Sequence, residues 1–374
     1  MPQEMACKPR FPLRKRAGTP FSREEISMNT LNILNRRNIL VTGGAGYIGS
    51  HTSRQLVNAG CNVVVVDNFY SGNRWAVPAQ AHLVEGDAGD FELMSRVMLE
   101  HKIDAVIHFA GHIVVSESVT DPLKYYGNNT SGSRNLIAAC LRTGVRHFIF
   151  SSSAAVYGVP GDNPILETTP VSPINPYGRS KLMTEWMLED AANSLVASQK
   201  NDAFRYVALR YFNVAGASLD GALGEATPEA THLIHIACQA ACGKRKKVAI
   251  YGTDYPTPDG TCVRDYIHVE DLATAHLLAL AHLLEGGSSE ALNCGYGYGF
   301  SVKEVLETVR RVSKIDFEIV SAGRRDGDPP ALIANTEKIR KLFPWKPTHQ
   351  DLETICTTAF LWEKNHPHAN RILP

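Results

Sequence analysis

Residues 38–56 read Asn38-Ile-Leu-Val-Thr-Gly43-Gly-Ala-Gly46-Tyr-Ile-Gly49-Ser-His-Thr-Ser-Arg-Gln-Leu56, and this stretch decides the fold. A short apolar run predicts a buried strand, a glycine turn follows it, and a helical stretch comes next. The three numbered glycines permit a tight turn and let the backbone approach a pyrophosphate closely, while N–H groups at the helix start can bind the anion. This order of elements predicts a dinucleotide-binding unit.

The choice of dinucleotide depends on Asp67, which ends the second apolar run about 20 residues further on. A carboxylate at that place can accept hydrogen bonds from the adenosine ribose hydroxyls, and it would repel a 2′-phosphate. We therefore expect NAD as the cofactor. Arg74 lies close enough in the sequence to leave NADP open as the alternative.

Beyond this unit, apolar runs alternate with helical stretches. The runs fall at 38–42, 62–67, 105–110, 147–152 and 206–211, and helices are expected near 229–242 and 301–313. Continuous β-rich runs separated by helices predict a parallel sheet covered on both faces. The expected fold class is α/β, a Rossmann-like doubly wound parallel sheet with a smaller α/β substrate-binding lobe.

The chain divides by pattern into three parts. Residues 1–37 are basic, rich in proline and poor in apolar periodicity, which predicts a disordered tail without a catalytic role. Met28 is an alternative start of translation within it. Residues 38–210 are expected to form the NAD-binding Rossmann domain and residues 211–374 the substrate-binding domain, with some later segments returning to the first.

Overall composition excludes several classes of protein. Lysine plus arginine equals aspartate plus glutamate at 38 each, so no net field favours nucleic acid or a membrane surface as a partner. The eight cysteines are scattered without a zinc-like spacing, which predicts free thiols, a reducing compartment and no metal. No stretch reaches the roughly 18 apolar residues of a membrane span, so we expect a cytoplasmic protein.

A tyrosine and a lysine stand four residues apart in Asn175-Pro-Tyr177-Gly-Arg-Ser-Lys181. Pro176 suits a helix start, so both side chains would share one helix face. A lysine ammonium beside a phenol is expected to lower the tyrosine pKa from about 10 toward the working pH, which makes Tyr177 a candidate base. The alternative is a solvated pair on a helix surface.

A serine run, Ser151-Ser-Ser153, ends the buried run at 147–152, and ligands bind at the carboxyl ends of strands in open α/β sheets. We assign Ser153 to hydrogen bonding with the oxygen that Tyr177 deprotonates. Ser151 and Ser152 are assigned to turn chemistry and helix capping.

The chain resembles the UDP-hexose 4-epimerases of the extended short-chain dehydrogenase/reductase superfamily. The resemblance rests on VTGGAGYIGSH, VDN, EGD, HFAG, SESV, YYGNN, SSSAAVYG, SPINPYGRSK, RYFNVAGA, VRDYIHVEDLA and RRDGDPP, which run from about residue 39 to 330. It implies interconversion of UDP-galactose and UDP-glucose, with transient oxidation of sugar C4 by a resident NAD. It also implies a role in galactose metabolism and a homodimer, and it makes 211–374 a UDP-sugar-binding domain.

The resemblance assigns most of the site position by position. In this assignment Tyr177, Lys181 and Ser153 are catalytic, and Lys181 also binds the nicotinamide ribose. The NAD contacts are Gly43, Gly46, Tyr47, Ile48, Gly49, Asp67, Asn68, Asp87, Phe109, Ala110, Gly111, Asn128, Tyr177, Lys181 and Phe212. The UDP-sugar contacts are Ser153, Asn213, His232, Leu233, Tyr251, Arg264, Arg325 and Asp328.

The two arginines are supported by chemistry as well as by resemblance. Arg264 and Arg325 can each offer a planar fork of donors to the oxygens of a diphosphate. The structural alternatives are an ion pair of Arg264 with neighbouring Asp265 and a solvated loop position for Arg325.

Three positions depart from the family pattern or leave it open. Ile113 stands where some members carry a lysine near the diphosphate, and His232 stands where an asparagine occurs in some members. His232 is either a replacement donor or a structural residue. Leu332, of intermediate bulk, leaves open whether UDP-GalNAc and UDP-GlcNAc are also accepted.

Other functions remain as alternatives. A 4,6-dehydratase needs an acid and a base where this chain has Ala154 and Ala155, which cannot transfer protons. A UDP-glucuronate decarboxylase needs a polar pocket for the sugar carboxylate. A non-catalytic NAD-binding module would not require both Tyr177 and Lys181.

Overall fold

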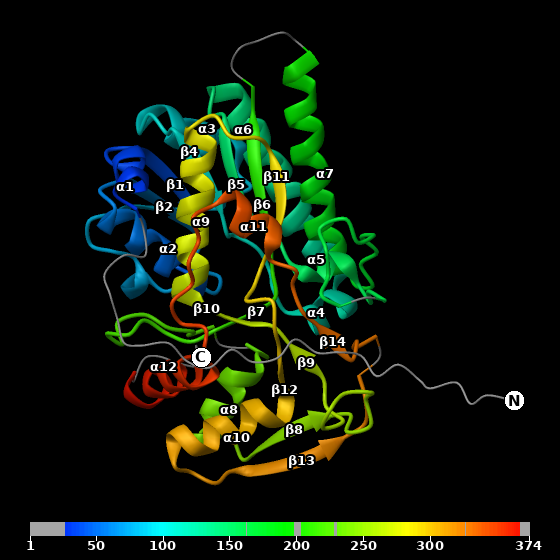
Figure 1. The fold of residues 1–374 in the computed structure, drawn as a ribbon. Helices are drawn as coiled ribbons and strands as arrows, with labels where there is room; N and C mark the ends of the chain where they lie inside the picture. The colour runs from blue at the N-terminus through cyan, green and yellow to red at the C-terminus, as the bar shows by residue number, and fades with distance from the viewer. Residues whose placement is uncertain (1–26, 162, 198–202, 228–229, 326, 367–374) are drawn as a thin grey trace, which may run out of the picture.

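The fold was analysed in a computed structural model, which describes residues 27–161, 163–197, 203–227, 230–325 and 327–366. Its largest sheet has seven parallel strands in the order β11-β6-β5-β4-β1-β2-β3 (Figure 1). The strands are β1 (Asn38–Thr42), β2 (Asn62–Asp67), β3 (His82–Glu85), β4 (Ala105–His108), β5 (His147–Ser151), β6 (Arg205–Tyr211) and β11 (Glu290–Cys294). The expected fold class is confirmed.

The apolar runs located the central strands closely. Those at 38–42 and 62–67 are strands with the same bounds, whereas the runs at 105–110 and 147–152 leave the sheet at His108 and Ser151. Strand β3 was not predicted. Its four residues are exposed or half-buried at the sheet edge, so they lack the continuous apolar pattern of a central strand.

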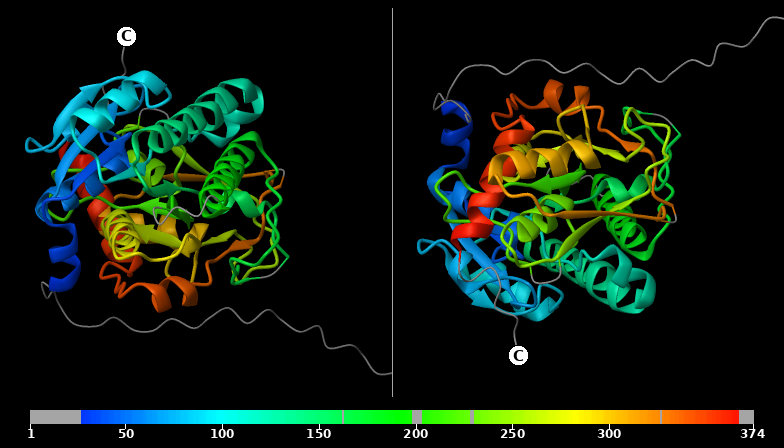
Figure 2. Two further views of the ribbon diagram at one scale, coloured as in Figure 1. Left: turned by 90° about the horizontal axis from the view of Figure 1, so that it is seen from above. Right: turned by 90° about the horizontal axis from the view of Figure 1, so that it is seen from below.

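Successive residues of the strands point to opposite faces, and each face is covered by helices (Figure 2). On β1, Ile39 and Val41 belong to a core with α1 (Met28–Leu34), α2 (Tyr47–Asn58) and α9 (Val269–Leu284). Leu40 belongs to the opposite core, with α3 (Phe91–Glu100), α6 (Gly132–Thr143) and α7 (Pro176–Ala197). Burial on both faces explains why these strands are continuously apolar.

Helix α1 corrects part of the predicted tail. Residues 27–37 were expected to be disordered, but Ser27 caps the helix by accepting a hydrogen bond from the Thr30 amide, and Leu34 is fully buried against α9 and its neighbours. The prediction missed this helix because seven residues carry too few apolar positions to show a helical period. The remainder of the predicted tail, residues 1–26, lies outside the described residues.

A smaller lobe lies below the carboxyl ends of the sheet strands in the view of Figure 1. Its helices α8 (Leu233–Ala241), α10 (Val302–Ser313) and α12 (Leu352–Asn365) pack together, and β8 (Lys247–Tyr251) pairs with β13 (Glu318–Ala322) in parallel. The predicted helices near 229–242 and 301–313 correspond to α8 and α10.

Two short sheets join the lobe to the main sheet. In one, β7 (Asn213–Ala215) pairs with β10 (Tyr266–His268); in the other, β9 (Val263–Arg264) lies between β12 (Phe300–Ser301) and β14 (Ala331–Leu332). The remaining elements are α4 (Val115–Thr120), α5 (Pro122–Tyr125), α11 (Glu337–Leu342), the 3-10 helices η1 (Arg74–Ala76) and η3 (Ala154–Tyr157), and the π-helix η2 (Tyr126–Ser131).

The chain crosses between the two lobes more than once. Helix α9 and strand β11 come from the segment 211–374, yet α9 packs on α2 and β11 pairs with β6 at the edge of the main sheet. None of the described helices is both long and apolar enough to cross a membrane.

Candidate functional site

One large cavity, the cleft, has a volume of about 830 Å³ and opens at the carboxyl ends of the sheet strands. Side chains and backbone from both lobes line it. All the residues that the sequence assigned to catalysis, cofactor or substrate are among them: Gly43, Gly46, Tyr47, Ile48, Gly49, Asp67, Asn68, Asp87, Phe109, Ala110, Gly111, Asn128, Ser153, Tyr177, Lys181, Phe212, Asn213, His232, Leu233, Tyr251, Arg264, Arg325 and Asp328. Residues up to 285 positions apart in the sequence therefore share one site, from Gly43 to Asp328.

The glycine turn at the start of α2 is shaped for close backbone approach. Gly43 follows β1 with φ +71°, a conformation that favours glycine, and a methyl group there would lie 2.6 Å from the Ala110 amide nitrogen. At Gly49 a methyl group would meet the Gly43 carbonyl oxygen at 2.2 Å. Gly46 is the N-cap of α2, so the N–H groups of the first helical turn point toward the cleft. These features fit a pyrophosphate at this end of the cleft.

Asp67 lies at the carboxyl end of β2 and is held by the backbone. Its carboxylate oxygens accept hydrogen bonds from the Ala45 amide at 2.9 Å and the Phe69 amide at 2.8 Å. Burial raises the pKa of Asp67, and these two bonds oppose that shift. Each oxygen has a second lone pair, so the carboxylate can still accept from ribose hydroxyls.

Arg74 does not provide the contact that a 2′-phosphate would need. Its guanidinium forms an ion pair with Glu85 and stacks over the Phe69 ring, 4.2 Å from the centroid. Arg74 is not among the residues that line the cleft. The donor set around Asp67 therefore fits NAD rather than NADP.

Tyr177, Ser153 and Lys181 converge in the middle of the cleft. Tyr177 and Lys181 lie one turn apart on α7, and Lys181 Nζ is 6.0 Å from the centroid of the tyrosine ring. Lys181 Nζ donates to the Ser151 carbonyl oxygen at 2.8 Å, and the Ser153 side chain is hydrogen-bonded to Tyr177. The first turn of α7 can approach η3 because residue 178 is glycine, where a methyl group would meet the Ala155 carbonyl oxygen at 2.5 Å.

The expected fall in the pKa of Tyr177 is wrong for this structure. Burial raises the Tyr177 pKa above its usual value, and the hydrogen bond with Ser153 opposes the rise. Burial also lowers the pKa of Lys181 to about 8, against the charge of Glu185. The lysine does not depress the tyrosine pKa because its ammonium is directed to a carbonyl oxygen and the phenol is removed from water.

The roles assigned to the other two serines also change. Ser151 is hydrogen-bonded to the Tyr211 hydroxyl, and Ser152 donates to Glu185 at 2.5 Å. The capping expected of these two is instead made by Ser153, which accepts from the Ala155 amide at 3.1 Å. Ser153 therefore has a local structural bond in addition to its bond with Tyr177.

Behind Lys181 lies a buried ion pair that the sequence did not reveal. Glu185 accepts from Arg210 of β6 at 2.6 Å, and Arg210 also donates to the Tyr157 hydroxyl at 2.9 Å. Glu185 is four residues after Lys181, so the helical spacing could have placed both on one face. Its partner on β6 has no such local signal.

The opposite end of the cleft carries the two predicted arginines. Arg264 forms an ion pair with Asp328, and the Arg325 guanidinium stacks over Tyr251 at 3.8 Å from the ring centroid. Arg264 does not form the ion pair with Asp265 that was the structural alternative, whereas Arg325 is an exposed loop residue that also lines the cleft. Asp265 is fully buried and accepts from backbone amides of Tyr296, Gly297 and Ala334, and burial raises its pKa to about 6.

The three departures from the family pattern all face the cleft. Ile113 is 41% exposed and supplies no hydrogen-bond donor from its side chain. Leu332 of β14 lines the cleft and packs with Phe212 against the same apolar cluster. His232 lies 2.5 Å from Glu225, measured from Nδ1 to Oε1. Glu225 was not identified from the sequence, since a lone glutamate in an irregular loop gives no signal.

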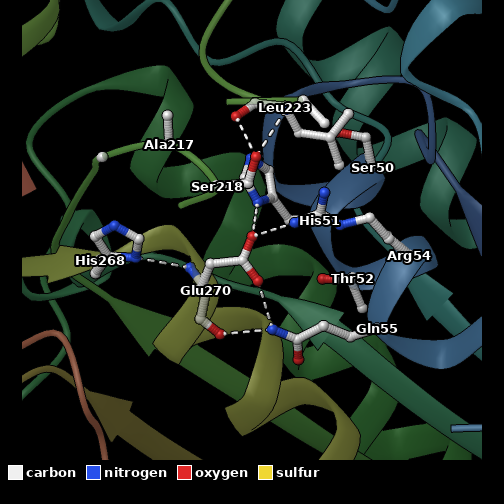
Figure 3. Close-up of polar contacts among 12 residues, drawn as sticks. Ser50, His51, Thr52, Arg54, Gln55, Ala217, Ser218, Leu223, His268 and Glu270 are labelled. Carbon is white, nitrogen blue, oxygen red and sulfur yellow. Dashed lines mark hydrogen bonds and ion pairs between the residues drawn. The ribbon is translucent and has the colours of Figure 1, made fainter. Parts of the chain in front are cut away.

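A second polar network, also missed, holds the glycine turn and α2 against α9 (Figure 3). His51 Nδ1 lies 2.6 Å from Glu270 Oε1, and Gln55 donates to the other carboxylate oxygen at 2.8 Å. Arg54 joins Glu270 at 3.1 Å. Burial raises the Glu270 pKa, but the His51 bond and charge outweigh it, with help from Gln55 and Arg54, and lower the pKa to about 2. The network fixes the helix that carries the phosphate-binding turn.

Comparisons with known proteins agree with this geometry. The model of the NAD dependent epimerase/dehydratase family matches residues 39–295. A UDP-glucose 4-epimerase of Azospirillum brasilense is 55% identical over 327 residues, which are 87% of this chain and 92% of that protein.

Two solved structures place the same fold beside bound ligands. A UDP-glucose 4-epimerase from Brucella ovis in complex with NAD has a TM-score of 0.84 at 46% identity and covers 88% of this chain and 98% of its own. One from Bifidobacterium longum in complex with NAD+ and UDP has a TM-score of 0.81 at 38% identity and covers 89% of this chain and all of its own. The resemblance drawn from the sequence is confirmed, and the chain belongs to the NAD dependent epimerase/dehydratase family.

Proposed function

We propose that the protein interconverts UDP-galactose and UDP-glucose by transient oxidation at sugar C4. The observation that carries the proposal is that Tyr177, Ser153 and Lys181 share one cleft with an NAD-fitting turn at one end and paired arginines at the other. The names of relatives up to 55% identical over most of the chain point to the same reaction.

In the proposed reaction each residue has a separate task. Tyr177 accepts the proton of the sugar 4-hydroxyl and later returns it to O4. Ser153 forms hydrogen bonds with O4 and with the tyrosine hydroxyl, which holds these two oxygens close enough for proton transfer between them. Lys181 is assigned to the nicotinamide ribose, and we propose that its charge favours the phenolate only once cofactor and substrate occupy the cleft, because burial raises the Tyr177 pKa in this structure. NAD held by the glycine turn and Asp67 would supply the acceptor, and then the donor, of the C4 hydride, so the reaction would have no net oxidation.

The two ends of the cleft hold the substrate and cofactor while the sugar turns. We assign the UDP diphosphate to Arg264 and Arg325 and the uridine ribose to Asp328, with Asn213, Leu233 and Tyr251 along the nucleotide. The main-sheet lobe serves NAD and the smaller lobe serves UDP-sugar. Because the bulk of Leu332 is intermediate, we also propose UDP-GalNAc and UDP-GlcNAc as further substrates.

A dehydratase reaction is not supported by the residues beside Ser153. Ala154 and Ala155 line the cleft where such an enzyme needs a proton donor and acceptor. No specific observation favours the decarboxylase or the non-catalytic alternative.

The proposal extends to a cytoplasmic homodimer. The seven described cysteines are all free, and six of them are buried, which suits a reducing compartment. Val119, Leu123 and Trp186 are 63%, 78% and 52% exposed on the adjoining helices α4, α5 and α7, an apolar face that a second copy could cover. Light scattering after gel filtration should give a dimer for the wild type and a monomer for Leu123→Asp.

The first experiment is to incubate the purified protein with UDP-galactose, without added NAD, and follow UDP-glucose by chromatography. Formation of UDP-glucose without added cofactor supports an epimerase with resident NAD. Absence of product, even with NAD supplied, would contradict the proposal. UDP-GalNAc run in parallel tests the wider sugar range.

A further inference from the structure

The pair formed by His232 and Glu225 lies at the wall of the cleft and is unlike the other ionisable pairs around it. His232 is the N-cap residue of α8, but its side chain makes no capping bond and instead meets Glu225 at 2.5 Å. The Glu225 side chain is only 8% exposed, whereas 40% of the His232 side chain is exposed, and the residue lines the cleft. The carboxylate is thus buried behind an imidazole that faces the cavity.

The surroundings favour a charged imidazole. Glu225 raises the pKa of His232 by its charge and hydrogen bond, and burial opposes this only in part. For Glu225, burial alone would raise the pKa. The charge and hydrogen bond of His232, together with the charge of His235, outweigh burial and lower the Glu225 pKa below its usual range. Both shifts have the sign of an imidazolium paired with a carboxylate.

Other ionisable groups around the pair come from α8, α12, α2 and β9 and from the segments that follow α8 and β13. On α8, His235 Nδ1 lies 4.0 Å from the second Glu225 oxygen and 3.7 Å from Glu363 of α12, which is itself paired with Lys244 at 2.7 Å. From α2, the Tyr47 phenol is close enough for Glu225 to raise its pKa. Across the cleft are Arg264 of β9 and Arg325 of the loop after β13. Glu225 is the carboxylate that contacts His232 directly.

The ring nitrogen left to the cleft is Nε2. Because Nδ1 is held against the buried Glu225, Nε2 lies on the far side of the ring, and no described group is within hydrogen-bond distance of it. Leu233, the first residue of α8, lines the cleft as well, so the helix N-terminus and the imidazole border the same cavity as the two arginines. A helix N-terminus, an imidazolium N–H and two guanidinium groups together form a strong site for a dianion.

We propose that Glu225 is a positioning residue that holds His232 as an imidazolium, and that His232 Nε2–H is a third cationic contact for the diphosphate of the UDP-sugar. The assignment of the ligand rests on the proposed function. Its consequence is that UDP-sugar affinity falls as the pH rises through the pKa of His232, because the neutral ring loses its charge. A family asparagine at this position would give affinity without this pH dependence.

The test is calorimetric titration of the purified holoenzyme with UDP-glucose between about pH 6 and about pH 9, a range that spans the raised pKa of the histidine. A UDP-hexose is used because both its phosphates are esterified and keep a constant charge. For the wild type we expect Kd to increase by about tenfold more across the range than for His232→Asn, the scale of one charge-assisted hydrogen bond, because any contribution of Lys181, with its pKa of about 8, is common to both proteins. For His232→Asn we expect a nearly constant Kd, about tenfold weaker than the wild type at the acidic end.

The Glu225→Gln variant tests whether Glu225 acts by keeping His232 charged or only by supporting the local structure. It keeps the imidazole but removes the carboxylate whose charge raises the His232 pKa, so the midpoint of the affinity change should move to lower pH. A purely structural role would change Kd equally at every pH. His282→Asn, a replacement of the same type far from the cleft at the end of α9, is the matched control and should keep the wild-type profile.

The outcomes distinguish this inference from the proposed function. A wild-type Kd that does not vary with pH, or a His232→Asn variant that keeps the wild-type dependence, overturns the inference while UDP-galactose is still epimerised. A failure of UDP-glucose to bind at any pH overturns both.

Discussion

At Lys181, burial opposes the charge that the proposed chemistry requires. The side chain is 4% exposed, and its pKa of about 8 lies below the usual 10.5. Between about pH 8 and about pH 10.5 the unfolded chain therefore binds more protons than the folded protein. The free energy of unfolding rises with pH in that window, because burial of the lysine charge destabilises the fold fully only below about pH 8.

Lys181→Met is accordingly expected to be less active but more stable. Turnover should fall at least about 100-fold. The free energy of unfolding at neutral pH should rise by up to about 3 kcal/mol, and the loss of the hydrogen bond to the Ser151 carbonyl reduces this gain. Urea unfolding of both proteins near pH 7 and near pH 10 checks this, since the advantage of the methionine variant should shrink at the higher pH. An advantage that is the same at both pH values would contradict the buried-charge account.

Tyr177→Phe removes the proton acceptor but keeps the ring that packs in the cleft. We expect NAD to stay bound and turnover to fall by about 100-fold to 10,000-fold. Chromatographic assay gives the turnover, and the absorbance of NAD released from the denatured variant gives its cofactor content. Rates close to those of the wild type would exclude Tyr177 as the base.

The residues of the site differ in how far the sequence reveals them. Tyr177 and Lys181 are recognisable because a helix brings positions four apart onto one face, and Asp67 because a strand end fixes its distance from the glycine turn. Glu225, Arg210 and Glu270 gave no signal, since each gains its role from a partner on a different element. Burial likewise decides the pKa values of Tyr177 and Lys181, and burial by distant segments cannot be read from a local motif.

Among the secondary-structure elements, α1 depends most clearly on a single contact. Leu34 is fully buried beneath α9, and Met28 at the other end of the helix is 72% exposed. Leu34→Ala should therefore lower the free energy of unfolding by about 2–4 kcal/mol, whereas Met28→Ala should change it by less than about 0.5 kcal/mol. Denaturant titration of the two variants tests the contact, and equal effects would mean that α1 does not pack as described.

Glu270 carries most of the polar contacts between helices α2 and α9, which also share an apolar core. With Glu270→Gln the charged hydrogen bonds from His51, Arg54 and Gln55 are weakened, and the free energy of unfolding at neutral pH should fall by about 2–4 kcal/mol. The folded pKa of about 2 is below the ordinary glutamate value, so this stabilisation is complete above about pH 4.5 and is lost as the pH falls toward 2.

Comparison of the two proteins across this acid range is therefore informative. The difference between wild type and Glu270→Gln should disappear at the acidic end. Glu92→Gln is the control, because Glu92 pairs with Arg142 on the surface with 72% of its side chain exposed, and it should change the free energy of unfolding far less than Glu270→Gln. A Glu270→Gln effect as small as that of the control would contradict the role of the network.

Across the whole molecule, the cleft is bounded by both lobes, so a bound cofactor stabilises their arrangement. Removal of NAD should lower Tm by several degrees, and NAD added back should restore Tm in a concentration-dependent way. NADP should restore it far less, because the Asp67 carboxylate would repel a 2′-phosphate and Arg74 is paired with Glu85. Differential scanning fluorimetry with both dinucleotides measures this, and equal recovery would contradict the preference for NAD.

The fold class followed from the alternation of apolar runs and helices, but the path of the chain between the lobes did not. The apolar run at 206–211 is the last strand that the sequence pattern predicts. In the structure this strand, β6, has β11 as its outer neighbour, and the two pair although they lie far apart in the sequence. The sequence also gives no sign of the short strands β7, β9, β12 and β14, because two or three residues are too few to show a strand periodicity.

The position of β11 has a consequence for synthesis on the ribosome. Translation is vectorial, so β6 is made long before its neighbour and its outer edge stays unpaired while the chain for α8, β8 and α9 is added. An exposed strand edge in a nascent chain is a point of association with other chains. The half of the protein that binds the dinucleotide can therefore close its sheet only after Cys294 has left the exit tunnel, and a chaperone that shields β6 until then would protect the yield of folded enzyme.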